Sequence, residues 1–299
     1  MTAAIANFRI RTTYQPNLLL AIVLPIAVAI IGPTVSPVVA AWLAALAFYA
    51  MFKIWTLQDF ARSVLISWPM AIAYLFLWPG MDPRAFSIRD ERTQKPTLDD
   101  WLWASGKTFV GAWLVWMLAG RFVTSHELIA GWIGLVGLGF LLHFGMFHLL
   151  ALGWRQASVP IEPIMHAPMF ANSVSDFWSR RWNLAFRDLA QVFFFRPFVA
   201  RVGVGGAIMI VFALSGLIHD LVISLPSGGG YGLPSLYFLA QGISVLTEKS
   251  KFGRRIGLGR GLTGRIVSWL VVVPGAYWLF HPPFIREVIL PTLSALRAF

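Results

Sequence analysis

Residues 202–225 read VGVGGAIMIVFALSGLIHDLVISL, a run of 24 residues in which only His219 and Asp220 carry ionisable side chains. A helix of roughly 20 apolar residues crosses the hydrocarbon core of a bilayer, so this run predicts a membrane span. Further apolar runs recur at 18–31, 38–54, 64–78, 101–119, 128–154, 233–246 and 266–280. Together the runs predict about eight membrane helices.

The composition agrees with this interpretation. Charged residues make up 12% of the 299 residues and apolar residues 58%, whereas soluble domains carry about 25% charged residues. This excludes a soluble enzyme, a disordered chain and a coiled coil. The absence of cysteine excludes a disulfide framework, a thiolate metal site and a Cys-bound covalent intermediate. We therefore expect an all-α integral membrane protein, a multi-span helical bundle in which residues 1–299 form a single domain.

The basic residues indicate an orientation in the membrane. The net charge is +11, and arginine and lysine gather in two segments, 155–201 and 249–265, on either side of the uncharged loop SLPSGGGYGLPS at 224–235. Cytoplasmic loops of membrane proteins are rich in Lys and Arg. We therefore expect both basic segments in the cytoplasm, 224–235 on the other side, and 82–100 inside by counting back. A charge of this kind does not indicate nucleic-acid binding.

The N-terminal run allows two interpretations. Arg9 and Arg11 precede the short run at 18–31, a pattern that also suits a cleavable signal peptide. No polar mature region follows, so we favour a retained helix. The same count of spans leaves the two arginines outside, which indicates that one N-terminal span is miscounted.

The segment 175–197, SDFWSRRWNLAFRDLAQVFFFRP, has two faces when it is drawn as a helix. One face is apolar and carries Trp178, Trp182, Ala185, Leu189 and Phe193. The opposite face is polar and carries Asp176, Arg180, Asn183, Arg187 and Gln191. One interpretation is an interfacial amphipathic helix with aromatic anchors and snorkelling arginines. The other is a cationic, hydrogen-bonding ledge that holds phosphates beside an apolar slot, and the two are compatible.

His219 and Asp220 lie near the depth of the bilayer in an otherwise apolar helix. Ionisable residues at such depth are costly and usually face an interior cavity, so a functional role is the default hypothesis. Ser215 precedes His219 by one turn on the same face. A desolvated histidine stays neutral near pH 7, the form that a general base requires. The alternative is a packing histidine that is hydrogen-bonded to a neighbouring carbonyl.

Two further patterns carry less weight. His143 and His148 are five residues apart, about 140° around a helix, so they cannot bind one metal from a single face and we expect no metal site. Residues 259–264, GRGLTG, match G-x-G-x-x-G, but no strand precedes them. A loop is the better interpretation of that motif than a dinucleotide site.

Two sequence blocks resemble a known family, the wax synthase branch of the membrane-bound O-acyltransferases. That branch carries an S-x-x-D-F-W-x-R-R-W-N block, here SVSDFWSRRWN at 173–183, and an S-G-x-x-H-E block in a membrane helix, here SGLIHD at 215–220. A third element, His-Gly followed by Glu and basic residues, is present as Gln241-Gly242 with Glu248 and Lys249 after it. The resemblance is confined to about 160–250, and the departure at Gln241 bears on the acceptor.

The resemblance implies transfer of an acyl group from acyl-CoA to the hydroxyl of a lipophilic alcohol, with no other cofactor. It implies that His219 is the catalytic base and that Asn183 orients or polarises a reacting group. Ser215 or a backbone N–H would stabilise the oxyanion. The substrate-binding residues would be Asp176, Trp178, Arg180, Arg181, Trp182, Arg187, Ser215 and Lys249, with the basic ones on the CoA phosphates and the tryptophans beside the acyl chain. The partners would be acyl-CoA, the alcohol and membrane lipids, in the cytoplasmic membrane if the chain is bacterial.

Two other functions compete with this one. A transporter or channel would use His219, Asp220 and Lys107 as a polar pathway, although no inverted repeat is visible in the sequence. A non-catalytic lipid-binding protein would keep the fold without the activity. Such a protein, however, has no use for a base at that depth.

Overall fold

The computed structural model describes residues 23–24, 26–27, 30–64, 67–87 and 90–299. The expected first span at 18–31, together with Arg9 and Arg11, lies largely outside them. Within the described residues every regular element is helical. The elements are η1 (Gly32–Thr34), α2 (Pro37–Ala61), α3 (Trp68–Leu77), η2 (Pro83–Ser87), α4 (Leu98–Trp113), η3 (Leu114–Leu118), η4 (Ala119–Phe122), α5 (Glu127–Leu138), η5 (Gly139–Met146), α6 (Phe147–Gln156), η6 (Pro168–Phe170), α7 (Val174–Asp176), η7 (Phe177–Arg181), α8 (Leu184–Ala190), η8 (Gln191–Phe195), α9 (Arg196–His219), η9 (Asp220–Ser224), α10 (Leu225–Ser227), α11 (Leu233–Lys249), α12 (Lys251–Arg255), α13 (Gly261–Leu279), α14 (Pro282–Phe284), η10 (Ile285–Ile289) and α15 (Leu290–Ala295).

Four helices of the described part are long and apolar enough to cross a membrane: Pro37–Ala61, Glu127–Gln156, Leu184–Ser227 and Gly261–Leu279. The all-α membrane architecture is therefore confirmed, but the expected number of about eight spans is not. The runs at 101–119 and 233–246 do form helices, α4 continuing into η3 and α11. Helix α11 falls short because it has only 17 residues.

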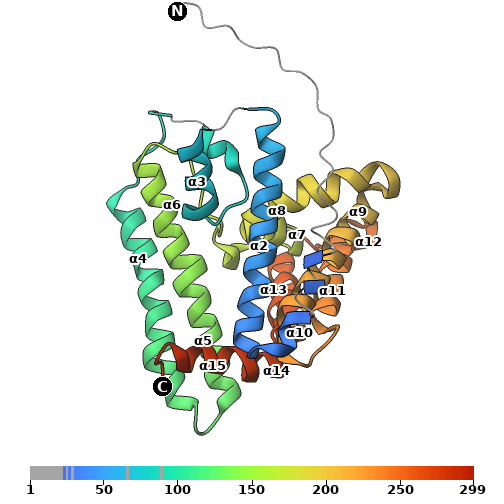
Figure 1. The fold of residues 1–299 in the computed structure, drawn as a ribbon. Coiled ribbons are helices and arrows are strands. Elements are labelled where there is room, and N and C mark those ends of the chain that lie inside the picture. Colours follow the sequence, from blue (N-terminus) through green and yellow to red (C-terminus); the bar gives the residue numbers. More distant parts are fainter. Residues whose placement is uncertain (1–22, 25, 28–29, 65–66, 88–89) are drawn as a thin grey trace, which may run out of the picture.

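The upright helices pack closely in two groups. In Figure 1, α4 and the continuous helix from α5 to α6 form one group and α9, α11 and α13 form the other, with α2 between them. Glycine permits the contact of α4 with η5, since a Cβ at Gly111 would collide with the backbone of Leu141. The C-terminal helix α15 crosses the end of the bundle in the same view. Two helical groups thus lie on either side of α2.

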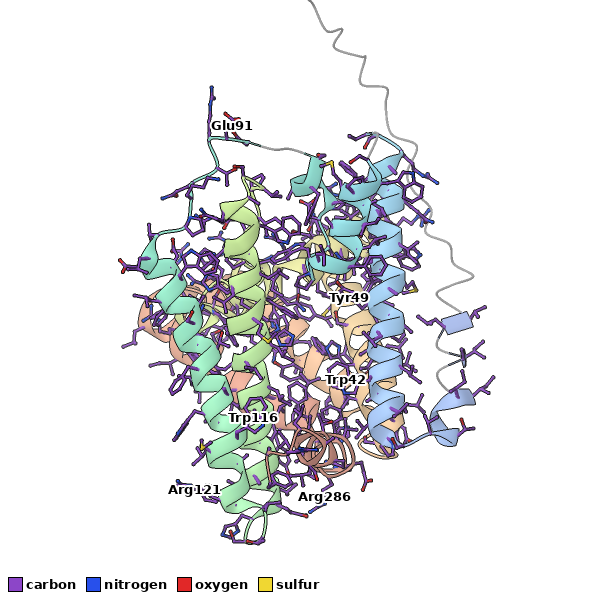
Figure 2. All side chains as sticks on the ribbon, turned by 60° about the vertical axis from the view of Figure 1, so that its left-hand side comes forward. Trp42, Tyr49, Glu91, Trp116, Arg121 and Arg286 are labelled. Atoms are coloured by element: carbon purple, nitrogen blue, oxygen red, sulfur yellow. The ribbon has the colours of Figure 1, made fainter. Side chains whose placement is uncertain are left out.

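The charged residues labelled in Figure 2 lie at the two ends of the bundle. Glu91 is at one end, Arg121 and Arg286 are at the other, and the aromatic side chains Trp42 and Tyr49 on α2 lie between them. At the far end Arg286 donates from Nε to Glu127 Oε1 at 2.6 Å. This distribution is the one expected of helices that cross an apolar layer.

The long helix Leu184–Ser227 is divided at Gly203. There φ is +70° and ψ is 175°, which only glycine adopts readily and which breaks the helical ladder. Before Gly203 the helix runs crosswise to α2, and after it the chain turns upright (Figure 1). Residues 204–227 are 24 residues, about 36 Å of helix, enough for one crossing. The crosswise part, before Gly203, overlaps the segment 175–197 for which the sequence predicts an interfacial helix.

The single helix predicted over 175–197 is not continuous in the structure. The chain leaves the helix at Trp182, which is extended, and at Asn183, whose φ is +44°. The freed backbone groups pair with a distant segment: the His166 amide donates to the Arg181 carbonyl and the Leu184 amide to that of Ile164, at 2.8 and 2.9 Å. The two continuous faces drawn for one helix are therefore wrong.

Helices α9 and α11 approach each other most closely at Gly216. A Cβ on this residue would lie 2.6 Å from Ser235 Cα, whereas a Cβ on Gly205 would lie 3.7 Å from Leu246 Cδ2. We expect Gly216→Ala to lower the free energy of unfolding by about 1–3 kcal/mol, since overpacking against backbone forces a shift. Gly205→Ala on the same helix is the matched control. Thermal unfolding of the purified variants measures both, and an equal shift for the two would contradict this contact.

Candidate active site

His219 is the last residue of α9, and one of its ring nitrogens is committed to the backbone. Nδ1 lies 2.7 Å from the carbonyl oxygen of Ser215. A carbonyl oxygen only accepts, so Nδ1 carries the proton. In the neutral ring Nε2 therefore keeps its lone pair, and Nε2 is the nitrogen that can act as a general base. The hydrogen bond to a neighbouring carbonyl, which the packing alternative predicts, is present. The same hydrogen bond leaves Nε2 of the neutral ring without a proton.

Trp178 of the first block and His219 of the second meet at the same residue of α11. The ring of Phe238 lies 4.5 Å from the His219 ring and 5.5 Å from that of Trp178, centroid to centroid. Trp178 also donates from Nε1 to Gln241 Oε1 at 3.1 Å and packs on Phe212 of α9. The structure thus brings these two predicted residues into one aromatic cluster.

The carboxylate of Asp220 is saturated by hydrogen bonds. It accepts from the Ser224 hydroxyl at 2.9 Å, from the Gly232 amide at 2.8 Å, and from both the amide and the hydroxyl of Ser235. Gly232 and Ser235 begin α11, and Phe238 lies one turn further along that helix. Asp220 therefore fixes the register of α9 against α11, and with it the contact of Phe238 on His219.

A buried histidine continues this network to the C-terminal segment. Nε2 of His281 lies 3.1 Å from the Ser224 hydroxyl, and Nδ1 accepts from the Phe284 amide at 3.3 Å. Nε2 must then carry the proton, so the chain of donors runs from His281 through Ser224 to Asp220. Burial lowers the pKa of His281, which favours this neutral ring. His281 stands beside a proline and 57 residues away from Ser224, so no local pattern in the sequence identifies it.

Glu248 anchors the first block, although it was not among the predicted site residues. It is 7% exposed, and its two carboxylate oxygens accept from the amides of Val174 and Ser175 at 2.7 and 3.0 Å. These amides begin α7, where a negative charge is favourable. Its place after Gln241-Gly242 in the third sequence element was the available signal.

We expect Glu248→Gln to destabilise the segment that carries Trp178. An amide has one oxygen, so its NH₂ group would face a backbone N–H where the carboxylate accepted. Loss of a hydrogen bond to a charged group costs about 1.5–3 kcal/mol. Limited proteolysis within 167–182, compared with an exposed control, Glu91→Gln, measures the effect. Equal cleavage rates for the two variants would show that Glu248 does not hold this segment.

Asp176 and Arg181 form an ion pair. Arg181 Nε lies 2.7 Å from Asp176 Oδ2, and the same oxygen accepts from the Asn172 amide. Partial burial raises the pKa of Asp176, but the hydrogen bonds from Arg181 and Asn172 outweigh it, and the net pKa is lowered. The pair therefore stays charged at neutral pH and closes one side of the first block.

Arg180 and Arg181 line a polar surface pocket of about 310 Å³. Arg180 is exposed. Gly259 of the GRGLTG loop, whose φ is +79°, also lines the pocket. The remaining lining residues are Asn172, Ser173, Ser175, Asp176 and Ser179. Two of the four cations expected on CoA phosphates thus share a pocket.

The other two cations lie elsewhere. Arg187 pairs with Asp188 at 2.7 Å and donates to the Ser179 carbonyl at 3.0 Å, while its buried Nε makes no hydrogen bond. Lys249 is exposed at the end of α11. Neither side chain lines the polar pocket.

Asn183 and Ser215 serve the backbone. Asn183 Oδ1 accepts from the Phe186 amide at 3.2 Å and so caps α8, and the Ser215 hydroxyl donates to the Val211 carbonyl at 2.8 Å. No hydrogen bond joins Asn183 to His219 among the described residues. They are linked by packing, since Phe186 and Ile218 belong to one apolar cluster with Phe52 of α2.

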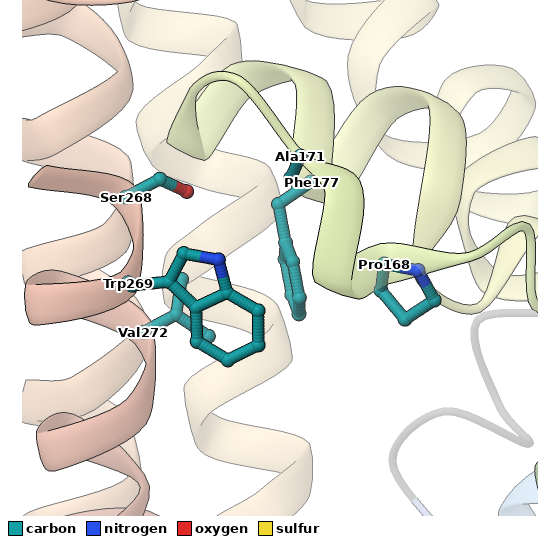
Figure 3. Close-up of a pocket in the computed structure, with 6 residues that line it drawn as sticks. All are labelled: Pro168, Ala171, Phe177, Ser268, Trp269 and Val272. Atoms are coloured by element: carbon teal, nitrogen blue, oxygen red, sulfur yellow. The ribbon is translucent and has the colours of Figure 1, made fainter. Parts of the chain in front are cut away.

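Trp182 shares the neighbour Phe177 with Trp178. Its ring stacks on Phe177 at 5.3 Å and meets the edge of Phe144 on η5. An apolar pocket beside Phe177 lies against Trp269 and Val272 of α13 (Figure 3). Its volume is about 10 Å³, room for one water molecule, so it does not hold an acyl chain.

The polar pathway of a transporter does not form one network. Lys107 Nζ contacts His148 Nδ1 at 2.6 Å between α4 and α6. Asp220 is bound by Ser224, Gly232 and Ser235 at the far end of α9. Within the described chain, no hydrogen bond connects these two groups.

Comparison with known proteins finds a family match over the segment that carries the two sequence blocks. Residues 161–240, which include both sequence blocks, match the membrane bound O-acyl transferase family. The chain is 31% identical over 141 residues to a long-chain-alcohol O-fatty-acyltransferase of Simmondsia chinensis. The alignment covers 42% of this chain and 39% of that protein. It is 26% identical over 159 residues to acyl-CoA–sterol O-acyltransferase 1 of Arabidopsis thaliana, covering 48% and 46%.

The chain spans less than half the length of the relatives it matches. The matched segment nevertheless contains His219, Trp178 and the polar pocket's arginines, and the relatives are named O-acyltransferases. The resemblance seen in the sequence is therefore confirmed: residues 161–240 of this chain are similar to the membrane bound O-acyl transferase family.

Proposed function

We propose that the protein transfers an acyl group from acyl-CoA to the hydroxyl of a lipophilic alcohol, as a wax synthase-like O-acyltransferase. The observation that carries the proposal is the hydrogen bond from His219 Nδ1 to the Ser215 carbonyl. It leaves Nε2 as a base in an apolar helix, inside the segment that matches the membrane bound O-acyl transferase family.

In this reaction His219 Nε2 removes the proton of the alcohol while the alcohol oxygen attacks the thioester carbonyl. The tetrahedral oxyanion collapses, the C–S bond breaks, and the proton on Nε2 passes to the leaving CoA thiolate. The products are the ester and CoA–SH, and His219 is neutral again. With no cysteine in the chain, transfer is direct and both substrates are bound together.

We place the phosphates of CoA in the polar pocket, with Arg180 as the ligand that is free to reach them. Guanidinium groups bind phosphate through two parallel hydrogen bonds. Arg181 already holds Asp176, so its role is to shape the pocket. The acyl chain and the alcohol would approach His219 from the side of Trp178 and Phe238. This assignment puts the basic segments 155–201 and 249–265 in the cytoplasm, where CoA is found.

A substrate panel tests the proposal. The purified protein is incubated with acyl-CoAs of several chain lengths and with fatty alcohols, sterols and short alcohols, and products are identified by mass spectrometry. We expect an ester that requires both one acyl-CoA and one alcohol. Ester formation without acyl-CoA would overturn the proposal. It would also be overturned if no pair of substrates gave an ester while the folded protein carried solute flux in liposomes.

A further inference from the structure

The segment that joins α11 to α13 presents a cluster of cations with no acidic residue among them. Between 249 and 265 the sequence has no Asp or Glu. Its basic side chains, all exposed, are Lys249, Lys251, Arg254, Arg255, Arg260 and Arg265. None of these forms an ion pair with a carboxylate of the described residues. We call this cluster the basic surface.

Large apolar side chains stand exposed among these cations. Phe252 is 65% exposed, Ile256 48% and Leu262 72%. The orientation of α12 is fixed by Gly253, which is buried so closely against the Thr247 carbonyl that no Cβ would fit. With that edge turned inward, Phe252 and the flanking cations are held outward. In water this arrangement exposes apolar area at a cost, whereas in a bilayer interface both kinds of side chain are satisfied.

The basic surface lies at the boundary of a membrane span. It begins where α11 ends and continues into the first turn of α13, whose 19 residues form a candidate span. In Figure 1, α12 lies at the end of α11 that is opposite to α10. Clusters of four or more basic residues directly beside a span favour anionic lipids.

We infer that the basic surface binds the headgroups of anionic phospholipids, with Phe252, Ile256 and Leu262 inserted among the acyl chains. A free phosphate would need only the cations, and the three apolar side chains select a lipid. The surface also borders the polar pocket, because Gly259 lines that pocket, and a Cβ on Gly259 would lie 3.7 Å from Ser173 Cβ and 3.9 Å from Glu248 Cβ. Bound lipid would therefore stand at the mouth of the pocket. This inference does not depend on the proposed reaction.

The cysteine-free chain allows a direct test. The variant Phe252→Cys, labelled with an environment-sensitive fluorophore, is reconstituted in vesicles of phosphatidylcholine that contain brominated phosphatidylglycerol or brominated phosphatidylcholine in equal amount. Bromine quenches only fluorophores that it touches. The matched control is Tyr231→Cys, which is 63% exposed in the uncharged loop at the other end of α11. Lipid is present on both sides of the vesicle, so the orientation of the protein does not matter.

At position 252 we expect brominated phosphatidylglycerol to quench severalfold more effectively than brominated phosphatidylcholine, and at position 231 we expect no difference. Adding Lys251→Gln, Arg254→Gln and Arg255→Gln to the labelled variant should lower the ratio toward one, by up to about fivefold per cation. Equal quenching by the two lipids at position 252 would overturn the inference, as would a ratio that the three substitutions leave unchanged. Displacement of the lipid by inorganic phosphate alone would also overturn it.

Discussion

Replacing His219 with alanine is expected to lower the rate of ester formation about 10²–10⁴-fold. Nε2 is the atom we assign to removal of the alcohol proton, and alanine supplies no acceptor in its place. The ring also contacts Phe238 at 4.5 Å, so some packing is lost as well. Initial rates with the ester-forming substrate pair, together with thermal unfolding of the same preparation, separate the two effects.

The control for this variant is His126→Ala. His126 is exposed at the loop before α5 and lies outside the segment shared with the family. We expect its rate to be that of the unmodified protein. A folded His219→Ala protein with an unchanged rate would show that His219 is a packing histidine and that the base is another group.

The second large effect is expected for Asp220→Asn. Asp220 receives four hydrogen bonds, three of them from the start of α11. Asparagine offers one oxygen and turns an NH₂ group toward donors, so Ser235 and the helix that carries Phe238 must shift. A displacement of about 1 Å at a reacting group can cost about 10²-fold in rate. We therefore expect kcat to fall by that order while KM for the acyl-CoA changes little.

The split between kcat and KM distinguishes a positioning residue from a merely structural one. If Asp220 only stabilised the fold, the surviving protein would show normal kcat and a lower unfolding temperature. Asp99→Asn, an exposed carboxylate at the start of α4, is the matched control. An unchanged kcat in Asp220→Asn would contradict the role assigned here.

The sequence predicted the parts of the fold that depend on local composition. Apolar runs identified the helices, because a run such as 202–225 can be satisfied only in an apolar layer. His219 stood out for the same reason, since an ionisable residue interrupts that run. The two motif blocks added the reaction class, and the family match at 161–240 confirms that resemblance.

The sequence failed where distant partners decide the local conformation. The break at Asn183 arises because the backbone of Ile164 and His166 pairs with residues on either side of it. An amphipathic period over 175–197 contains no sign of this pairing. As a result, Arg187 was placed with Arg180 on one polar face, whereas in the structure Arg187 does not line the pocket that Arg180 lines.

The supporting residues were also invisible for reasons of distance. Glu248 caps a helix 74 residues earlier in the chain, and His281 reaches Ser224 across 57 residues. Each is an ordinary polar residue near a helix end in the sequence. Only the packing of α11 and α14 against the site reveals that these side chains hold it together.

The central claim is direct transfer from acyl-CoA to an alcohol, and a time course of CoA release tests it most directly. The chain contains no cysteine, so a thiol reagent added to the purified protein reports only CoA. With an excess of acyl-CoA and no alcohol we predict no release, and with the alcohol added we predict CoA and ester in equal amounts. A burst of CoA without alcohol, equal to the amount of protein, would contradict direct transfer by revealing an acyl-enzyme.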